Sequence, residues 1–159
     1  MPRKKVIKDK ETQEEIKKVK SEKSEKGKYI ETVGRRKTAV ARVRLFAKKI
    51  ETGEGLEIIV NEKPLSSYFN YEKDQKTVKA PFKELSLKGY GVEVKVKGGG
   101  IKAQAEAIRL GISRALVKLN PLWRSPLKTL GFLKRDPRMV ERKKYGKRKA
   151  RRPQQWRKR

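Results

Sequence analysis

The last part of the chain, residues 134–159, interleaves cations with aromatic side chains. It contains 14 Lys and Arg against 2 Asp and Glu, with Tyr145 and Trp156 among them. Cations neutralise phosphates and aromatic rings stack on bases, so this combination is typical of nucleic-acid contact. A localisation signal or a solubilising tail would explain the charge, but neither gives Trp156 a role. The pattern therefore predicts a tail that binds nucleic acid.

A second basic motif lies at the start of a predicted strand and reads Gly34-Arg35-Arg36-Lys37-Thr38. Three cations at one turn can hold the phosphates of a nucleic-acid backbone. The alternative is a loop whose charges are merely solvated. With 46 Lys and Arg against 18 Asp and Glu, a formal charge of +28, contact with RNA is the favoured interpretation.

Three glycines, Gly98-Gly99-Gly100, directly precede a predicted helix. Such a turn lets the first N–H groups of the helix and its dipole bind an anion, and phosphate is the obvious candidate. The spacing matches neither a dinucleotide fingerprint nor a P-loop, so no nucleotide cofactor is indicated. A tight turn that only reverses the chain explains the glycines as well, and both interpretations stay open.

The composition argues against catalysis and against a membrane location. Cysteine and histidine are both absent, which removes thiolate chemistry and the usual general base. Carboxylates such as Glu57 and Glu62 have no nucleophile grouped with them. No apolar run approaches the roughly 20 residues of a membrane span, and no signal peptide is present. We expect a cytoplasmic protein that is not an enzyme and uses no metal, cofactor or small-molecule substrate.

The elements that must position these motifs are predicted from hydrophobic periodicity. Residues 38–46 alternate as a strand, and a β-branched run at 56–60 is expected to pair with it as a hairpin. A short helical turn at 64–69 follows, and residues 76–87 are ambiguous. Alternation is clearest over the strand at 90–97, whose even positions should face the core.

Helical spacing follows the glycines. Apolar residues recur every three or four positions over 101–119, and Asn120-Pro121 should end this helix. A second short helix is expected at 122–130. The chain thus divides into a disordered Lys/Glu-rich extension at 1–28, a globular α+β core at 29–133, and an extended basic tail at 134–159.

Four motifs resemble, in order, those of the small-subunit ribosomal protein nine family in its bacterial type. They are residues 34–43, the segment 61–65 with Tyr68-Phe69, the glycine turn with the helix through Leu116, and residues 135–144. The resemblance covers residues 29–159. Bacterial members typically end in Pro-Gln-Phe-Ser-Lys-Arg, whereas this chain ends in Gln154-Gln155-Trp156-Arg157-Lys158-Arg159. The extension at 1–28 also lies outside it.

The resemblance implies an α+β fold of about four strands with helices on one face. Its βαβ unit would be left-handed, as in the second domain of small-subunit protein five, against the usual rule. It implies a structural role in the head of the small subunit, beside other head proteins, with the tail reaching transfer RNA in the peptidyl site. A free-standing basic nucleic-acid chaperone is the alternative.

Two sets of contact residues are expected. Those expected to bind ribosomal RNA are Arg35, Arg36, Lys37, Gly98, Gly99, Gly100, Lys102, Gln104, Arg109, Arg114, Arg135, Arg138, Arg142, Lys143, Lys144, Lys147, Arg148, Lys149, Arg151 and Arg152. Those expected to bind transfer RNA are Trp156, Arg157, Lys158 and Arg159.

Overall fold

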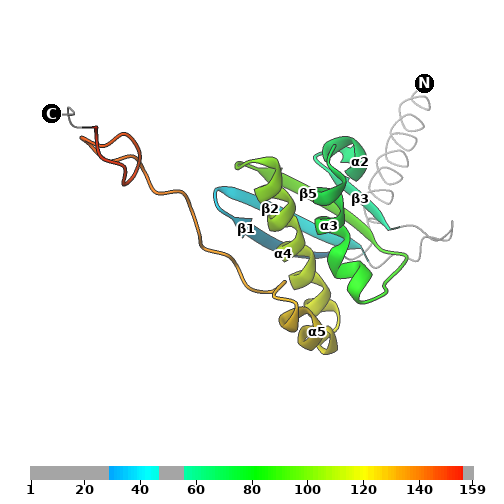
Figure 1. Cartoon of the computed structure of the whole chain (residues 1–159). Helices are drawn as coiled ribbons and strands as arrows, with labels where there is room; N and C mark the ends of the chain where they lie inside the picture. Colours follow the sequence, from blue (N-terminus) through cyan, green and yellow to red (C-terminus); the bar gives the residue numbers. More distant parts are fainter. Residues whose placement is uncertain (1–28, 47–55, 156–159) are drawn as a thin grey trace, which may run out of the picture.

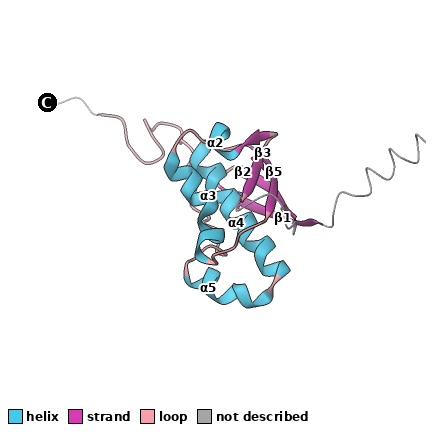
Figure 2. Cartoon of the chain, turned by 90° about the vertical axis from the view of Figure 1, so that its right-hand side faces the viewer, coloured by secondary structure: helices cyan, strands magenta, loops and turns pink. Residues whose placement is uncertain are grey.

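A mixed five-stranded sheet with helices on one face forms the body of the protein (Figures 1 and 2). The computed structural model describes residues 29–46 and 56–155. The predicted extension at 1–28 and the tip at 156–159 therefore lie outside the described residues. The strand order is β1-β2-β5-β3-β4. The strands are β1 (Tyr29–Arg36), β2 (Ala39–Phe46), β3 (Glu57–Val60), β4 (Lys63–Pro64) and β5 (Gly91–Lys97). The α+β class is confirmed. The sheet has five strands where the resemblance implied about four, and β4 is only two residues long.

The pairing of the strands corrects one prediction. β2 pairs antiparallel with β1 on one side and with β5 on the other. The hairpin predicted between residues 38–46 and 56–60 is therefore wrong. β3 instead lies parallel to β5. Parallel neighbours need a long crossover, and the segment between these two strands contains two helices.

The described helices follow the sequence pattern closely. They are α2 (Leu65–Tyr68), α3 (Glu72–Glu84), α4 (Ile101–Leu119), the 3₁₀ turn η1 (Pro121–Trp123) and α5 (Arg124–Thr129). The bounds predicted for α4 are confirmed. α3 resolves the ambiguous region as helix, although Pro81 lies inside it, because Val78 and Phe82 are buried on its inner side. No helix in the described ranges is long and apolar enough to cross a membrane.

The helix α4 lies directly on β1 and β2 through two glycines. A Cβ placed on Gly34 would lie 1.9 Å from the carbonyl oxygen of Ala107, and one on Gly111 would lie 2.5 Å from a methyl carbon of Val43. The buried Thr32 hydroxyl donates to the Gly111 carbonyl at 2.7 Å. The absence of side chains at both positions lets helix and sheet approach this closely, which fixes where the cations of α4 stand relative to β1.

The turn between β3 and β4 explains the Asn-Glu-Lys-Pro-Leu motif in structural terms. Asn61 and Glu62 both have positive φ, 47° and 68°, as a tight hairpin turn requires. The Asn61 amide group also donates to the Val96 carbonyl at 3.0 Å and accepts from the Val96 N–H at 2.8 Å. The side chain thus continues the ladder of β5 where β3 has ended.

Candidate nucleic-acid interface

The two turns that sequence analysis singled out lie against each other at one end of the sheet. A Cβ on Gly98 would lie 2.6 Å from the Thr38 carbonyl oxygen, and one on Gly99 would lie 2.8 Å from the Ala39 Cβ. Both glycines have positive φ, +72° and +68°. Their lack of side chains is therefore required by the packing of the protein itself. The basic turn at 35–37 and the glycine turn form one exposed end of the core.

The third glycine differs from the other two. A Cβ on Gly100 would meet nothing within 4 Å. Gly100 is the N-cap of α4, where no side chain accepts a hydrogen bond and no acidic residue occupies the first turn. Lys102 is exposed in that turn. The first N–H groups of α4 are thus left for an external acceptor, as the anion interpretation requires.

Gln104 has a role inside the protein. Its amide nitrogen donates to the Gly98 carbonyl at 3.1 Å, and its amide oxygen accepts from the Tyr68 hydroxyl at 2.9 Å. Both ends of the side chain are thereby engaged. Gln104, expected to contact RNA, holds the glycine turn in place against α2.

Arg36 points to the side of the sheet that the helices cover, opposite the buried Ala39. Its side chain is only 11 % exposed, and its Nε pairs with Glu106 on α4. One Nη donates to the Arg138 carbonyl at 2.6 Å, and the other lies 3.1 Å from Asp136 Oδ2. Arg36, expected to bind phosphate, has its donors directed at protein acceptors. Arg35, one residue earlier, is exposed.

Arg138 completes this cluster. Its backbone N–H donates to Asp136 Oδ1 at 2.9 Å, and its Nη2 donates to Oδ2 at 2.7 Å. These hydrogen bonds hold the pKa of Asp136 well below its usual range and raise the pKa of Arg138. We call Arg36, Glu106, Asp136 and Arg138 the tail anchor, because they fasten the start of the tail to β1 and α4.

Replacing Arg36 with Gln is expected to release the start of the tail, because one guanidinium joins three acceptors there. The chain has no cysteine, so Lys83→Cys on α3 and Tyr145→Cys in the tail provide two labelling sites for dyes. The distribution of dye separations measured by energy transfer should broaden in Arg36→Gln. The control is Lys37→Gln, which removes the same charge from the neighbouring, exposed side chain. It should leave the distribution of dye separations unchanged. Equal distributions in both variants would contradict the anchor.

Beyond the anchor, the tail folds back on itself. Residues 134–140 extend from the core, and residues 141–153, the tail loop, close at the end of the described chain (Figure 1). Arg151 donates to both carboxylate oxygens of Glu141, at 3.0 and 2.6 Å, and the Arg148 N–H donates to the Arg152 carbonyl at 2.9 Å. The hydrogen bond from Arg151 lowers the pKa of Glu141. The expected tail is therefore extended only in its first part.

The tail loop gathers like charges. Its remaining cations are exposed: Arg142, Lys143, Lys144, Lys147, Arg148, Lys149 and Arg152. Tyr145 is fully exposed among them. Within the described residues, the only carboxylate paired with this loop is Glu141, which engages Arg151. Such a concentration of charge repels itself unless an anion lies nearby.

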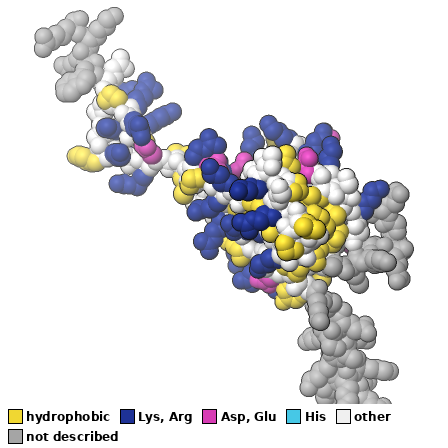
Figure 3. Space-filling model, turned by 90° about the horizontal axis from the view of Figure 1, so that it is seen from below, with side chains coloured by type: hydrophobic (Ala, Val, Ile, Leu, Met, Phe, Trp, Pro, Cys, Tyr) yellow, Lys and Arg dark blue, Asp and Glu magenta, His cyan; other side chains and the backbone are white. Residues whose placement is uncertain are grey.

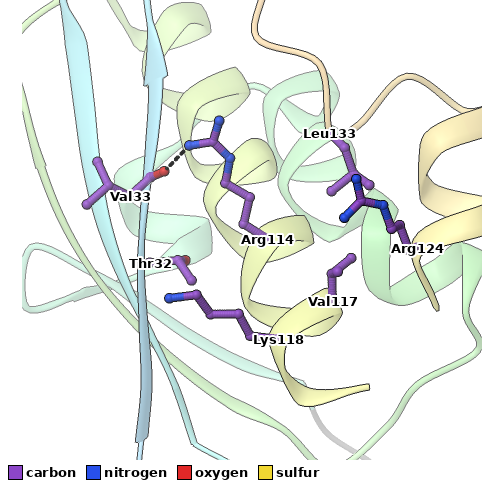
Figure 4. A pocket seen from close by; sticks show the side chains of 7 residues that line it. All are labelled: Thr32, Val33, Arg114, Val117, Lys118, Arg124 and Leu133. Carbon is purple, nitrogen blue, oxygen red and sulfur yellow. Dashed lines mark hydrogen bonds between the residues drawn. The ribbon is translucent and has the colours of Figure 1, made fainter. Parts of the chain in front are cut away.

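Two other expected cations stand on α4. The Arg109 guanidinium lies over the Phe132 ring, 4.9 Å from its centroid, and so holds the segment after α5 on the helix. The Arg114 Nη1 donates to the Val33 carbonyl of β1 at 2.8 Å (Figure 4). Because the carbonyl and the ring are both neutral, the positive charge of each arginine is not neutralised.

Two cations close to Arg114 were not predicted from the sequence. Lys118 and Arg124 line, together with Arg114, an open hollow of about 470 Å³ between β1, α4 and α5 (Figure 4). The spacing of four residues between Arg114 and Lys118 could have predicted that they share a helix face. Arg124 reaches the same place because η1 turns the chain after α4, and local periodicity carries no sign of that.

The arginines on the uncovered face of the sheet are different. Glu31 lies 3.3 Å from Arg42 and 3.2 Å from Arg44, and Glu93 lies 3.7 Å from Arg44. The hydrogen bond with Glu31 raises the pKa of Arg44. Carboxylates therefore offset the charge of β2. By contrast, Lys and Arg side chains gather where the core adjoins the tail (Figure 3).

This distribution of charge defines a class of protein. An α+β core with unbalanced cations at one side, continued by a tail of like charge, is the arrangement of a protein that binds a polyanion. Comparison with known proteins makes the class specific. The family profile described as Ribosomal protein S9/S16 matches residues 34–159.

Curated relatives agree with the family profile. A protein of Synechococcus sp. (strain JA-3-3Ab) named small ribosomal subunit protein uS9 is 52 % identical over 128 residues, covering 79 % of this chain and 89 % of the relative. The protein of that name from Amoebophilus asiaticus (strain 5a2) is 49 % identical over 131 residues, covering 82 % and 98 %. The one from Synechocystis sp. is 50 % identical over 128 residues, covering 79 % and 89 %.

The chain therefore belongs to the Ribosomal protein S9/S16 family. It is a small-subunit ribosomal protein that acts in translation, at the ribosome in the cytoplasm, and it is not an enzyme. The resemblance drawn from the four sequence motifs is confirmed by both comparisons.

Proposed function

We propose that the chain binds ribosomal RNA in the head of the small subunit, next to other head proteins, and that the end of its tail contacts transfer RNA in the peptidyl site. The observation that carries the proposal is the tail loop. It presents seven exposed cations that no carboxylate among the described residues offsets, away from the core. Arrays of this kind bind phosphates without reading sequence.

The described contacts distinguish two groups among the expected RNA-binding residues of the paired turns and the tail. Arg36, Gln104 and Arg138 are bonded within the protein and support the site by positioning it. The residues proposed to touch RNA directly are exposed. They are Arg35 and Lys37 in the basic turn, Lys102 after the glycine turn, Arg135, and the seven tail-loop cations that are not paired with Glu141. The N–H groups that follow Gly100 add an acceptor site for one phosphate.

We also propose that the crossover from β3 through α3 to β5 is left-handed. Support comes from the family, whose resemblance to the second domain of small-subunit protein five was noted above. The parallel pairing of β3 and β5 across α2 and α3 supplies the βαβ unit that this proposal needs.

Deleting residues 156–159 is expected to weaken binding of transfer RNA to the peptidyl site while leaving subunit assembly intact. The segment holds Trp156, which can stack on a base or ribose, and three cations beyond the tail loop. Loss of one stacking contact and one charged hydrogen bond would weaken the free energy of transfer-RNA binding by about 1–3 kcal/mol. Filter binding of transfer RNA to subunits carrying either form of the chain, at matched salt, measures the difference.

A double substitution, Gln154→Ala with Gln155→Ala, is the control, because it alters neighbouring residues without removing charge or an aromatic ring. It should bind transfer RNA as the parent does. Equal affinities for subunits with the intact and the shortened chain would refute the proposed contact.

The alternative of a free-standing nucleic-acid chaperone predicts a different result when small subunits are washed with salt. A ribosomal protein stays with small subunits through a moderate salt wash, whereas a chaperone held by nonspecific charge is released. Family membership favours retention.

A further inference from the structure

The hollow between β1, α4 and α5 is built from cations and apolar walls. Arg114 and Lys118 approach it from α4 and Arg124 from the first residue of α5 (Figure 4). Val117 and Leu133 form apolar parts of its wall. Among the residues that the structure describes, no carboxylate lines it. The hollow is open to solvent, and its volume of about 470 Å³ leaves room for a phosphate together with a sugar.

The positive charge of the hollow is not balanced by the protein. Arg114 donates to the Val33 carbonyl at 2.8 Å, and Lys118 donates to the Glu31 carbonyl at 3.3 Å. The carbonyls orient these side chains but, being neutral, do not neutralise their charge. In the described part of the chain, none of the three cations has a carboxylate within salt-bridge distance. Three cations around one space repel each other, and an anion between them would relieve that repulsion.

A purely structural role explains only part of this arrangement. β1 is the end strand of the sheet, and Arg114 and Lys118 cover two of its carbonyls. Arg124 has no hydrogen bond to β1 in the described residues. Arg124 therefore adds electrostatic repulsion without covering β1. A ligand bound by all three cations accounts better for its position.

We propose that this hollow binds a backbone phosphate of small-subunit ribosomal RNA, with the adjoining sugar against Val117 and Leu133. The proposal rests on the RNA-binding function proposed above and assigns it a second place on the core. Leu133 adjoins the start of the tail, so RNA seated here could continue along the tail. A phosphate suits this site because guanidinium groups bind two of its oxygens at once, while Lys118 adds a point charge.

The test is a double variant, Lys118→Gln with Arg124→Gln, which leaves the Arg114 bond to β1 in place. The matched control is Lys79→Gln with Lys83→Gln on α3, which removes the same charge from exposed positions. Binding of the full chain to small-subunit ribosomal RNA is measured across a range of KCl concentrations. The first variant should bind about tenfold more weakly, and its slope of log affinity against log salt should fall by about 1, as expected for one lost phosphate contact; the control should show neither change.

Urea unfolding of all forms shows whether the variants are folded, and the comparison is made between forms of equal stability. If both double variants weaken binding to the same extent, the hollow is no site and only net charge matters. The RNA-binding function itself would be refuted by a separate result. The unaltered chain would then bind small-subunit ribosomal RNA no better than an unrelated RNA of equal length.

Discussion

Deletion of residues 134–159 is expected to reduce the affinity of the chain for small-subunit ribosomal RNA at least about a hundredfold at moderate salt. The segment contributes 14 cations and 2 carboxylates, one of which is tied to the anchor and the other to Arg151. If about half of the cations contact phosphates, the slope of log affinity against log salt should fall by about 6. Titrations at several KCl concentrations give both quantities.

The control is deletion of residues 1–28, which also removes a charged terminus. That segment has 11 basic and 6 acidic residues, a net charge of +5 against +12 for the tail. Its removal should therefore change the salt slope much less. A larger fall in slope after the amino-terminal deletion would mean that the tail loop is not the main phosphate-binding surface.

Gly34→Ala is expected to destabilise the fold by about 3 kcal/mol, at the upper end of overpacking costs. The new Cβ would lie 1.9 Å from the Ala107 carbonyl oxygen and 2.6 Å from the Gly111 nitrogen. Both are backbone atoms of α4, so no side chain can turn aside and the helix itself must move. Urea unfolding followed by circular dichroism measures the loss.

Gly91→Ala is the matched control within the same sheet. Its Cβ would have its nearest contact at 3.7 Å, with the Phe46 Cβ, and Gly91 lies on a strand. Alanine there should change the free energy of unfolding by under about 1 kcal/mol. If the two variants were equally stable, the close contact between α4 and β1 would not exist in solution.

Most local elements of the fold were predictable, but β1, α3 and the pairing of the strands were not. α4 was placed correctly because Ile108, Ile112 and Leu116 repeat at helical spacing, and β5 because Val92, Val94 and Val96 alternate. β1 was missed because the sites that face α4 include Thr32 and Gly34, neither of which gives an apolar signal. The parallel pairing of β3 with β5 joins segments more than 30 residues apart, which no short-range pattern encodes.

The candidate site shows a similar limit. Residue type predicted where cations gather, but it could not distinguish Arg35 from its neighbour Arg36. The distinction comes from strand geometry. Successive side chains point to opposite faces, and Arg36 points toward α4, where it forms the tail anchor with Glu106, Asp136 and Arg138. Glycine likewise has two uses. Gly98 packs against the Thr38 carbonyl in the turn before β2 and Gly99 packs against Ala39 of β2, whereas Gly100 leaves the start of α4 open.

The two side chains that α4 places along β1 also affect the behaviour of the protein before it joins the small subunit. β1 ends the sheet, and an end strand is a template on which another copy can add a strand and begin aggregation. Lys118 and Arg114 already hydrogen-bond to the carbonyls of Glu31 and Val33, two acceptors that an incoming strand would need. Their charges also repel a second copy of so basic a chain. We therefore expect these two side chains to hinder strand addition between newly made copies before assembly.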